Sequence, residues 1–122
     1  MSIDIKAAKK SFVARQQKRF EQQETIRIAV LDKVRKAIPA IVARYADVEA
    51  VYLFGSILRP GAFTYDSDID VAVEKISAEE YFRLWQDLET ALPDWAIDLR
   101  DLPPDTNFTR QIYRTGEKIY GG

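Results

Sequence analysis

The first third of the chain carries apolar residues at helical spacing. From about Ile5 to Tyr45 the sequence is rich in Ala, Lys, Arg, Gln and Glu, which favour helix. Pro39 interrupts this stretch and cannot donate the helical hydrogen bond, so a kink or a break into two helices is predicted near Ile38. The residues that keep a helical period, and are therefore predicted to lie on the core, are Ile28, Leu31, Val34, Ile38, Ile41 and Tyr45.

The N-terminal part of this stretch is much more polar. The run from Ala14 to Gln23 contains Phe20 as its one large apolar residue. A helix that polar is either exposed to solvent or binds a partner. We therefore predict a basic helical arm over residues 1–24, followed by one domain over residues 25–122.

In the rest of the chain, alternation and β-branched or aromatic residues indicate strands. The predicted strands are Val48–Phe54, Asp68–Glu74, Trp95–Leu102 and, as a candidate, Glu117–Tyr120. Ser77 begins a helix, with Glu80 three residues later in a capping box, and Pro93 ends it. A short helix follows over Phe108–Arg114. This order predicts an α/β (α+β) fold, a small mixed sheet covered by helices on one face.

Composition restricts the chemistry that the chain can perform. Its 122 residues suit one domain, and 47% hydrophobic with 30% charged residues is ordinary for a globular protein with one core. The chain has no cysteine and no histidine. Disulfides, thiolate metal sites, Ser-His and Cys-His nucleophiles and the usual zinc ligands are therefore excluded. Catalysis must rest on carboxylates, lysine, tyrosine, hydroxyls or a hard metal ion held by oxygen.

Charge is unevenly distributed, although the net charge is only −1. Residues 1–47 carry 11 Lys and Arg against 5 Asp and Glu, whereas residues 48–122 carry 7 against 14. The two halves therefore meet different partners or each other, unless the basic half is simply a solvated helix face. No stretch approaches the ~20 apolar residues that span a bilayer. Residues 1–10 lack the apolar core of a signal peptide, so a cytoplasmic protein is expected.

The candidate chemistry lies in residues 53–73, LFGSILRPGAFTYDSDIDVAV. Residues i and i+2 of a strand point to the same face, so Asp68 and Asp70 are predicted to project together while Ile69 faces the packed side. Two adjacent carboxylates repel each other, and a hard divalent cation such as Mg²⁺ relieves that repulsion.

A third carboxylate follows from the pattern WAIDLRDL at residues 95–102. If Ile97 and Leu99 pack on the helices, Asp98 stands on the open face with the other two carboxylates. Three convergent carboxylates fit a two-metal site, whose ions lie about 3.5–4 Å apart and hold the attacking and leaving oxygens in line.

The loop after the first strand supplies groups suited to phosphate. Gly55 permits close backbone approach, and the N–H groups and hydroxyl around Ser56 can cradle phosphate oxygens. Arg59 can neutralise phosphate charge. Each group also has a plain alternative: a Gly-Ser turn, a solvated Asp-x-Asp strand end or a surface arginine, and Asp101 competes with Asp98 for the third position. The combination at the ends of predicted strands favours a site.

These motifs resemble the signature of the DNA polymerase β-like nucleotidyltransferase superfamily, and in particular of the minimal nucleotidyltransferase (MNT) proteins. They are GSILRPG at residues 55–61 and DSDID at residues 66–70. Eleven residues separate Ser56 from Asp68, one more than is usual in the family, and Pro60 is the candidate for the extra residue. The resemblance runs from about Ile28 to Tyr120.

The resemblance implies an αβ nucleotidyltransferase core that uses Mg²⁺ as cofactor and ATP as donor. By analogy, Asp68, Asp70 and Asp98 would be the catalytic and metal-binding residues, and Asp98 would also help to deprotonate the acceptor hydroxyl. The implied nucleotide-binding residues are Gly55, Ser56, Arg59 and Ser67.

Many MNT proteins are antitoxins paired with HEPN-domain RNase toxins, and some transfer AMP to a tyrosine of the toxin. The resemblance therefore implies a protein AMP-transferase that silences a HEPN toxin, with neither membrane insertion nor direct nucleic-acid binding expected. Because nearly all residues after the arm are committed to the core, a partner would bring the acceptor, and Lys6–Arg19 is a candidate docking element. Two alternatives stay open: an antitoxin that only masks its toxin, and a small-molecule nucleotidyltransferase.

Overall fold

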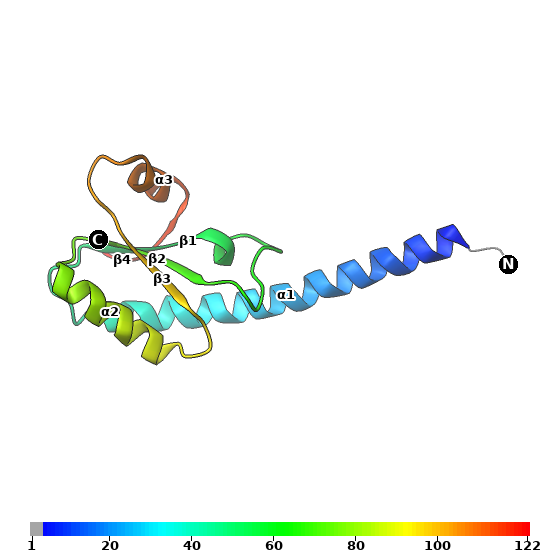
Figure 1. The fold of residues 1–122 in the computed structure, drawn as a ribbon, viewed down its shortest axis with the longest axis horizontal. Helices are drawn as coiled ribbons and strands as arrows, with labels where there is room; N and C mark the ends of the chain where they lie inside the picture. Colours follow the sequence, from blue (N-terminus) through cyan, green and yellow to red (C-terminus); the bar gives the residue numbers. More distant parts are fainter. Residues whose placement is uncertain (1–3) are drawn as a thin grey trace.

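A long helix projects from a body built on a four-stranded sheet (Figure 1). The computed structural model describes residues 4–122. The strand order β3-β2-β1-β4 combines antiparallel β1–β2 and β1–β4 pairs with a parallel β2–β3 pair, so the sheet is mixed, as predicted. The elements in chain order are α1 (Ile5–Val42), β1 (Ala50–Phe54), the 3₁₀ turn η1 (Gly55–Leu58), β2 (Ile69–Glu74), α2 (Ala78–Ala91), β3 (Ile97–Asp101), α3 (Asn107–Thr115) and β4 (Glu117–Tyr120).

One face of the sheet packs against α1 and α2. Val51 and Leu53 of β1 and Val71 of β2 join Val34 of α1 and Leu84 of α2 in one buried cluster. Burying each side chain of this size contributes about 1.5–3 kcal/mol, so this cluster is the main source of stability. The predicted fold class is confirmed.

The other face carries a smaller cluster beneath α3. Tyr52 of β1 and Ala72 of β2 are buried together with Ile112 of α3. Phe54 meets Phe108 edge to face, with the ring centroids 5.5 Å apart. The structure thus adds a short helix on the second face of the sheet, next to the end of β1.

Two side chains of α2 close the edge of the sheet at β3. The indole Nε1 of Trp85 donates to the carbonyl of Ile97 over 3.0 Å, and the Tyr81 hydroxyl donates to the carbonyl of Leu99. An edge strand otherwise presents unpaired backbone groups to other chains. The apolar face of α2 therefore satisfies the sheet edge as well as the core.

The first helix is continuous from Ile5 to Val42, so the break predicted near Ile38 is wrong. Pro39 lies in the last turn, where only one helical hydrogen bond is lost before the helix ends. Ile28 was also expected on the core but is 57% exposed, because it lies about 120° round the helix from Val34 at the centre of the buried stripe. The remaining predicted core positions of this segment are buried: Leu31, Val34, Ile38, Ile41 and Tyr45.

The arm is the exposed part of α1. Asp4 begins the helix, and its carboxylate accepts the N–H of Ala7 over 3.1 Å. Every residue from 4 to 22 is exposed, including the apolar side chains of Ile5, Phe12 and Val13. None of the helices in residues 4–122 combines the length and apolarity needed to cross a bilayer.

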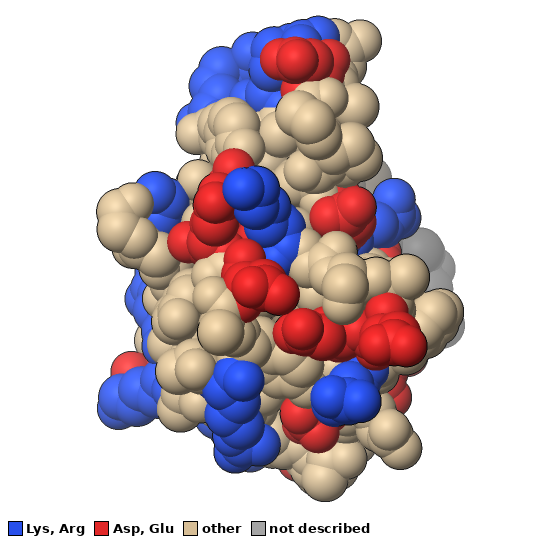
Figure 2. All heavy atoms as spheres, turned by 90° about the vertical axis from the view of Figure 1, so that its left-hand side faces the viewer, with Lys and Arg blue, Asp and Glu red and all other residues tan. Residues whose placement is uncertain are grey.

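Within residues 4–122, the basic and acidic halves form an ion pair in the body. Arg35 of α1 pairs with Glu117 of β4 at 2.6 Å. Figure 2 shows acidic side chains, mixed with Lys and Arg, across the end of the body away from the arm. Lys75, directly after β2, pairs with Glu49, directly before β1, at 3.0 Å. The arm projects in the opposite direction, so its basic side chains do not meet this acidic end within one molecule.

Removal of residues 1–16 is expected to leave the body folded. None of residues 4–16 is buried, so the midpoint of thermal unfolding should change by less than about 4 °C while the helical circular-dichroism signal falls. A thermal melt followed at 222 nm, compared with the full chain, checks both values. A larger fall in the midpoint would show that the arm stabilises the core.

Candidate active site

Carboxylates gather where β2 begins. Asp70 and Asp98 are direct neighbours in the parallel register of β2 with β3, and Phe54 lies opposite Asp70 on β1. Asp68 precedes Asp70 by two residues and is exposed. Paired residues of neighbouring strands share a face, so the sequence argument that put the carboxylates together agrees with the register.

Asp70 is the carboxylate with the most constrained surroundings. It is half-buried, and burial is the main reason that its pKa rises to about 6. The negative charges of Asp98 and Asp68 raise the pKa further, whereas Arg100 and Arg59 act in the opposite direction. The other two predicted carboxylates and the predicted Arg59 therefore lie within electrostatic reach of Asp70.

Asp98, not Asp101, stands next to the other carboxylates. The register pairs Asp98 with Asp70 but pairs Asp101 with Val73, three steps further along the strands. Arg100 holds the Asp98 carboxylate through Nε at 3.1 Å and Nη2 at 3.4 Å. Asp101 accepts the N–H of the following residue over 2.9 Å. Of the two aspartates, Asp98 is thus the neighbour of Asp70, and its role in the site stays a prediction.

Gly55 allows the backbone to approach Asp70 closely. Its φ is +78°, and a Cβ atom built on it would lie 2.1 Å from Oδ2 of Asp70. Only glycine combines that φ with that space. The turn η1 follows at once, with the Arg59 N–H donating to the Ser56 carbonyl over 3.0 Å. Gly55 therefore lies directly against the Asp70 carboxylate, and Ser56 follows it in the chain.

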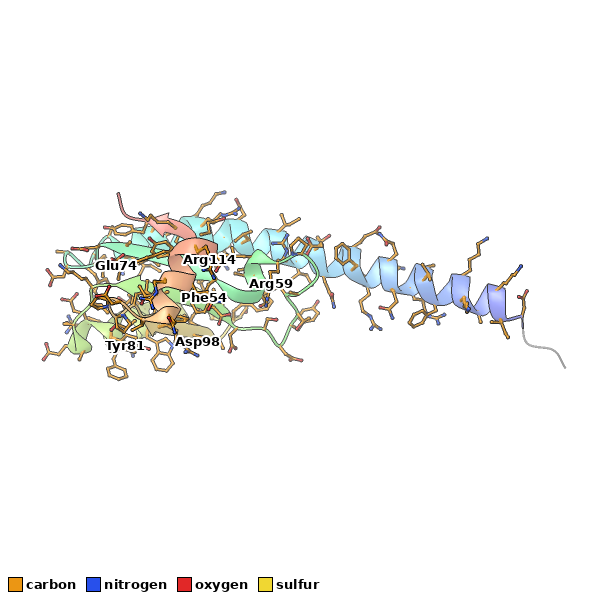
Figure 3. All side chains as sticks on the ribbon, turned by 90° about the horizontal axis from the view of Figure 1, so that it is seen from above. Phe54, Arg59, Glu74, Tyr81, Asp98 and Arg114 are labelled. Atoms are coloured by element: carbon orange, nitrogen blue, oxygen red, sulfur yellow. The ribbon has the colours of Figure 1, made fainter. Side chains whose placement is uncertain are left out.

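A cavity of about 500 Å³ opens beside this turn. It lies on the side of the sheet that carries α3, where Figure 3 labels Phe54, Arg59 and Asp98. Gly55 and Arg59 line this cavity, whereas the three predicted carboxylates do not. The lining residues are Phe54, Gly55, Leu58, Arg59, Phe108, Gln111, Ile112 and Thr115.

Ser67 shapes the turn that leads into β2. Its hydroxyl accepts the N–H of Thr64 over 2.9 Å, and its own N–H donates to the Thr64 carbonyl over 3.1 Å. The hydroxyl is engaged within the loop, so Ser67 orients the backbone just before Asp68. Its contact with a nucleotide stays a prediction.

The carboxylate oxygens of the site suit a hard cation whose coordination shell is completed by oxygens of a substrate. Mg²⁺ is usually held by one or two carboxylates together with substrate phosphates. Asp70 and Asp98 form such a pair, and a cation would relieve the repulsion that raises the pKa of Asp70. Among residues 4–122, no three acidic side chains already converge on one metal position. The residues therefore fit a metal ion that arrives with phosphate rather than one held by protein alone.

Alternation predicts Arg100 on the face of Asp98, two residues further along β3, but not the ion pair that the two side chains form. Sequence reasoning missed two other residues near the site. Glu24 and Arg27 belong to α1, and no local pattern links them with the loop after β1, which they contact.

Several solved structures resemble this chain in fold and sequence. A toxin–antitoxin crystal structure, MntA–HepT with two aspartates replaced by glutamate, is 26% identical with a TM-score of 0.60, covering 72% of this chain and 73% of that one. A toxin–antitoxin structure with AMP-PNP is 28% identical with the same TM-score and coverage. A structure from Shewanella oneidensis is 26% identical with a TM-score of 0.52, covering 76% and 71%. Functionally curated proteins give no match.

The family model described as polymerase beta nucleotidyltransferase matches residues 36–122. The matched segment contains every carboxylate and every loop residue of the candidate site, from Gly55 to Asp98. On the strength of this match, the chain belongs to the polymerase β nucleotidyltransferase family.

Proposed function

We propose that this chain is an antitoxin that transfers AMP from ATP to a tyrosine hydroxyl of a HEPN-type toxin and thereby neutralises it. The observation that carries the proposal is the pairing of Asp70 with Asp98 beside Gly55, within a nucleotidyltransferase domain. Similar solved structures are toxin–antitoxin complexes, one of which contains the ATP analogue AMP-PNP. These likenesses support both the donor and the kind of acceptor.

Each part of the site has a role in the proposed transfer. Asp68, Asp70 and Asp98 would hold Mg²⁺ together with oxygens of the triphosphate, and the ion would polarise the phosphate oxygens and align the reacting atoms. The N–H groups around Ser56 and the guanidinium of Arg59 bind the triphosphate. Asp98 accepts the proton of the acceptor hydroxyl. The acceptor oxygen then bonds to the α-phosphorus, the bond from that phosphorus to the bridging oxygen breaks, and pyrophosphate leaves.

The main competing function is an antitoxin that masks its toxin without chemistry. The arm favours it, because Ile5, Phe12 and Val13 form an exposed apolar surface that needs no nucleotide to bind a protein. The two functions make different predictions for the aspartates.

Incubation of the purified chain with its HEPN-domain partner, ATP and Mg²⁺ is expected to add AMP units to the partner. Asp70→Asn should slow this addition at least about 100-fold, because it removes a metal-binding oxygen at the reacting centre. Asp101→Asn changes the same charge on β3 away from the site and should react at the wild-type rate. Intact-mass spectrometry of the partner measures the increments. A stable complex without any increment would contradict the transferase.

A variant with both Asp68→Asn and Asp70→Asn separates transfer from masking. If transfer neutralises the toxin, this variant should fail to protect RNA from cleavage by the HEPN partner at equal concentration. The assay is RNA degradation followed on a gel, with complex formation verified by size-exclusion chromatography. Full protection by the double variant would show that masking is sufficient.

Gly55→Ala is expected to damage both the fold and nucleotide binding. The new Cβ meets the Asp70 carboxylate, and the positive φ is strained for alanine, so stability should fall by about 1–3 kcal/mol. Binding of AMP-PNP with Mg²⁺, measured by calorimetry, should weaken by about tenfold or more, since the turn must move. Gly122→Ala is the matched control, because a Cβ there has no neighbour within 4 Å. Wild-type binding by Gly55→Ala would contradict the assigned role of the turn.

A further inference from the structure

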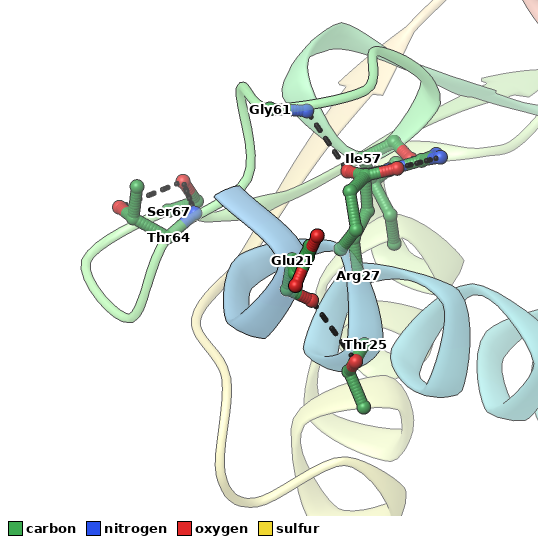
Figure 4. A network of polar contacts seen from close by, with 8 residues as sticks. Glu21, Thr25, Arg27, Ile57, Gly61, Thr64 and Ser67 are labelled. Carbon is green, nitrogen blue, oxygen red and sulfur yellow. Dashed lines mark hydrogen bonds and ion pairs between the residues drawn. The ribbon is translucent and has the colours of Figure 1, made fainter. Parts of the chain in front are cut away.

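The helix α1 holds the loop after β1 at two points. Arg27 donates from Nη1 to the carbonyl of Ile57 over 2.9 Å, and Glu24 accepts the N–H of Gly61 over 2.8 Å. Figure 4 shows Arg27 on α1 close to Ile57 and Gly61 of the loop. These two contacts lie on either side of Arg59, so the segment that carries the phosphate-binding groups is anchored before and after it.

Glu24 and Arg27 also bind each other. The guanidinium contacts both carboxylate oxygens, with Nε to Oε2 at 2.8 Å and Nη2 to Oε1 at 2.9 Å. Both side chains are largely shielded from solvent, with 16% of the Glu24 side chain and 10% of the Arg27 side chain exposed. Hydrogen bonds from Arg27 and from the Gly61 N–H lower the pKa of Glu24, which keeps this carboxylate ionised. The pair therefore acts as one rigid unit between helix and loop.

A third contact comes from the arm side of the helix. A Cβ atom on Gly61 would lie 2.8 Å from a ring carbon of Phe20, so the ring packs directly on the glycine backbone. Phe20, Glu24 and Arg27 are spaced i, i+4 and i+7 and share one stripe of α1. One face of α1 thus contacts the loop at both Ile57 and Gly61.

We propose that Glu24 and Arg27 are positioning residues for nucleotide binding, which fix the loop so that the Ser56 backbone and Arg59 are set for the triphosphate. This inference rests on the proposed nucleotidyltransferase function. A loop already held in its binding conformation loses less conformational entropy when the ligand binds. Both residues lie outside the family-matched segment 36–122, so this anchor comes from the helix that continues into the arm.

Arg35 and Glu117 provide a matched comparison. They form a second bidentate pair from α1, at 2.7 and 2.6 Å, but they tie the helix to β4. A role limited to attaching α1 to the body predicts similar effects for both pairs. A positioning role predicts an effect on the nucleotide only for Glu24 and Arg27.

The test measures AMP-PNP binding with Mg²⁺ by calorimetry on the full-length chain, for wild type, Glu24→Gln, Arg27→Lys and Arg35→Lys. Glu24→Gln keeps the shape of the side chain, and Arg27→Lys keeps the charge but loses the bidentate geometry. We expect about tenfold weaker binding for these two variants and less than about twofold change for Arg35→Lys. Thermal unfolding measures any loss of stability. Hydrogen exchange measures how firmly the loop is held, and the Gly61 amide should exchange faster in Glu24→Gln than in wild type.

Reversal of the pair tests whether the ion pair itself is sufficient. In the double variant Glu24→Arg, Arg27→Glu the two charges can pair again, but a guanidinium then faces the Gly61 N–H and a carboxylate faces the Ile57 carbonyl. Restored thermal stability without restored AMP-PNP binding supports positioning, whereas recovery of both overturns it.

Three results contradict the proposal in distinguishable ways. Wild-type AMP-PNP binding by Glu24→Gln and Arg27→Lys would overturn the positioning role and leave the transferase standing. Equal weakening in all three single variants, Arg35→Lys included, would reduce the role to general stability. Failure of the wild-type chain to bind AMP-PNP would overturn the proposed function and the positioning role with it.

Discussion

The crowding of carboxylates at the start of β2 is the constraint around which the site is arranged. Parallel, in-register strands put Asp70 beside Asp98, and burial together with like charge disfavours the ionised form of Asp70. The surrounding groups act against this cost: Arg59 and Arg100 supply positive charge. Stability alone gives no reason for such a pairing, which becomes favourable when a cation and phosphate complete the site.

Much of the site could be predicted because its signals are local. Strand alternation correctly put Asp70 and Asp98 on one face, whereas Asp68 lies just before β2 and acts on Asp70 through its charge. Gly55 after a buried strand indicated a close approach of the backbone. The order of helices and strands, and the helix start at Ser77, likewise follow from periods and caps; the Ser77 hydroxyl accepts the N–H of Glu80 over 3.2 Å. These features depend on residues within a few positions of one another.

The features that could not be predicted depend on contacts distant in sequence. Arg27 lies 30 residues from Ile57, and a polar residue on a helix gives no sign of the carbonyl that it will meet. The break expected at Pro39 failed for a different reason, since the proline falls so near the helix end that little bonding is lost. Ile28 is exposed although it fits the helical period. The period alone does not show which side of the helix will pack on the sheet, and here the expected side included a residue about a third of a turn away from the buried stripe.

The closed edge at β3 restricts the direction from which another protein can reach the carboxylates. Trp85 and Tyr81 already occupy the outward carbonyls of Ile97 and Leu99, on the same strand that carries Asp98. In the transfer proposed above, an extended segment of the acceptor would therefore not lengthen the sheet at this strand. Its hydroxyl would come across the face of the sheet, and the shape of the surface around the reacting group, not main-chain pairing, would select the acceptor.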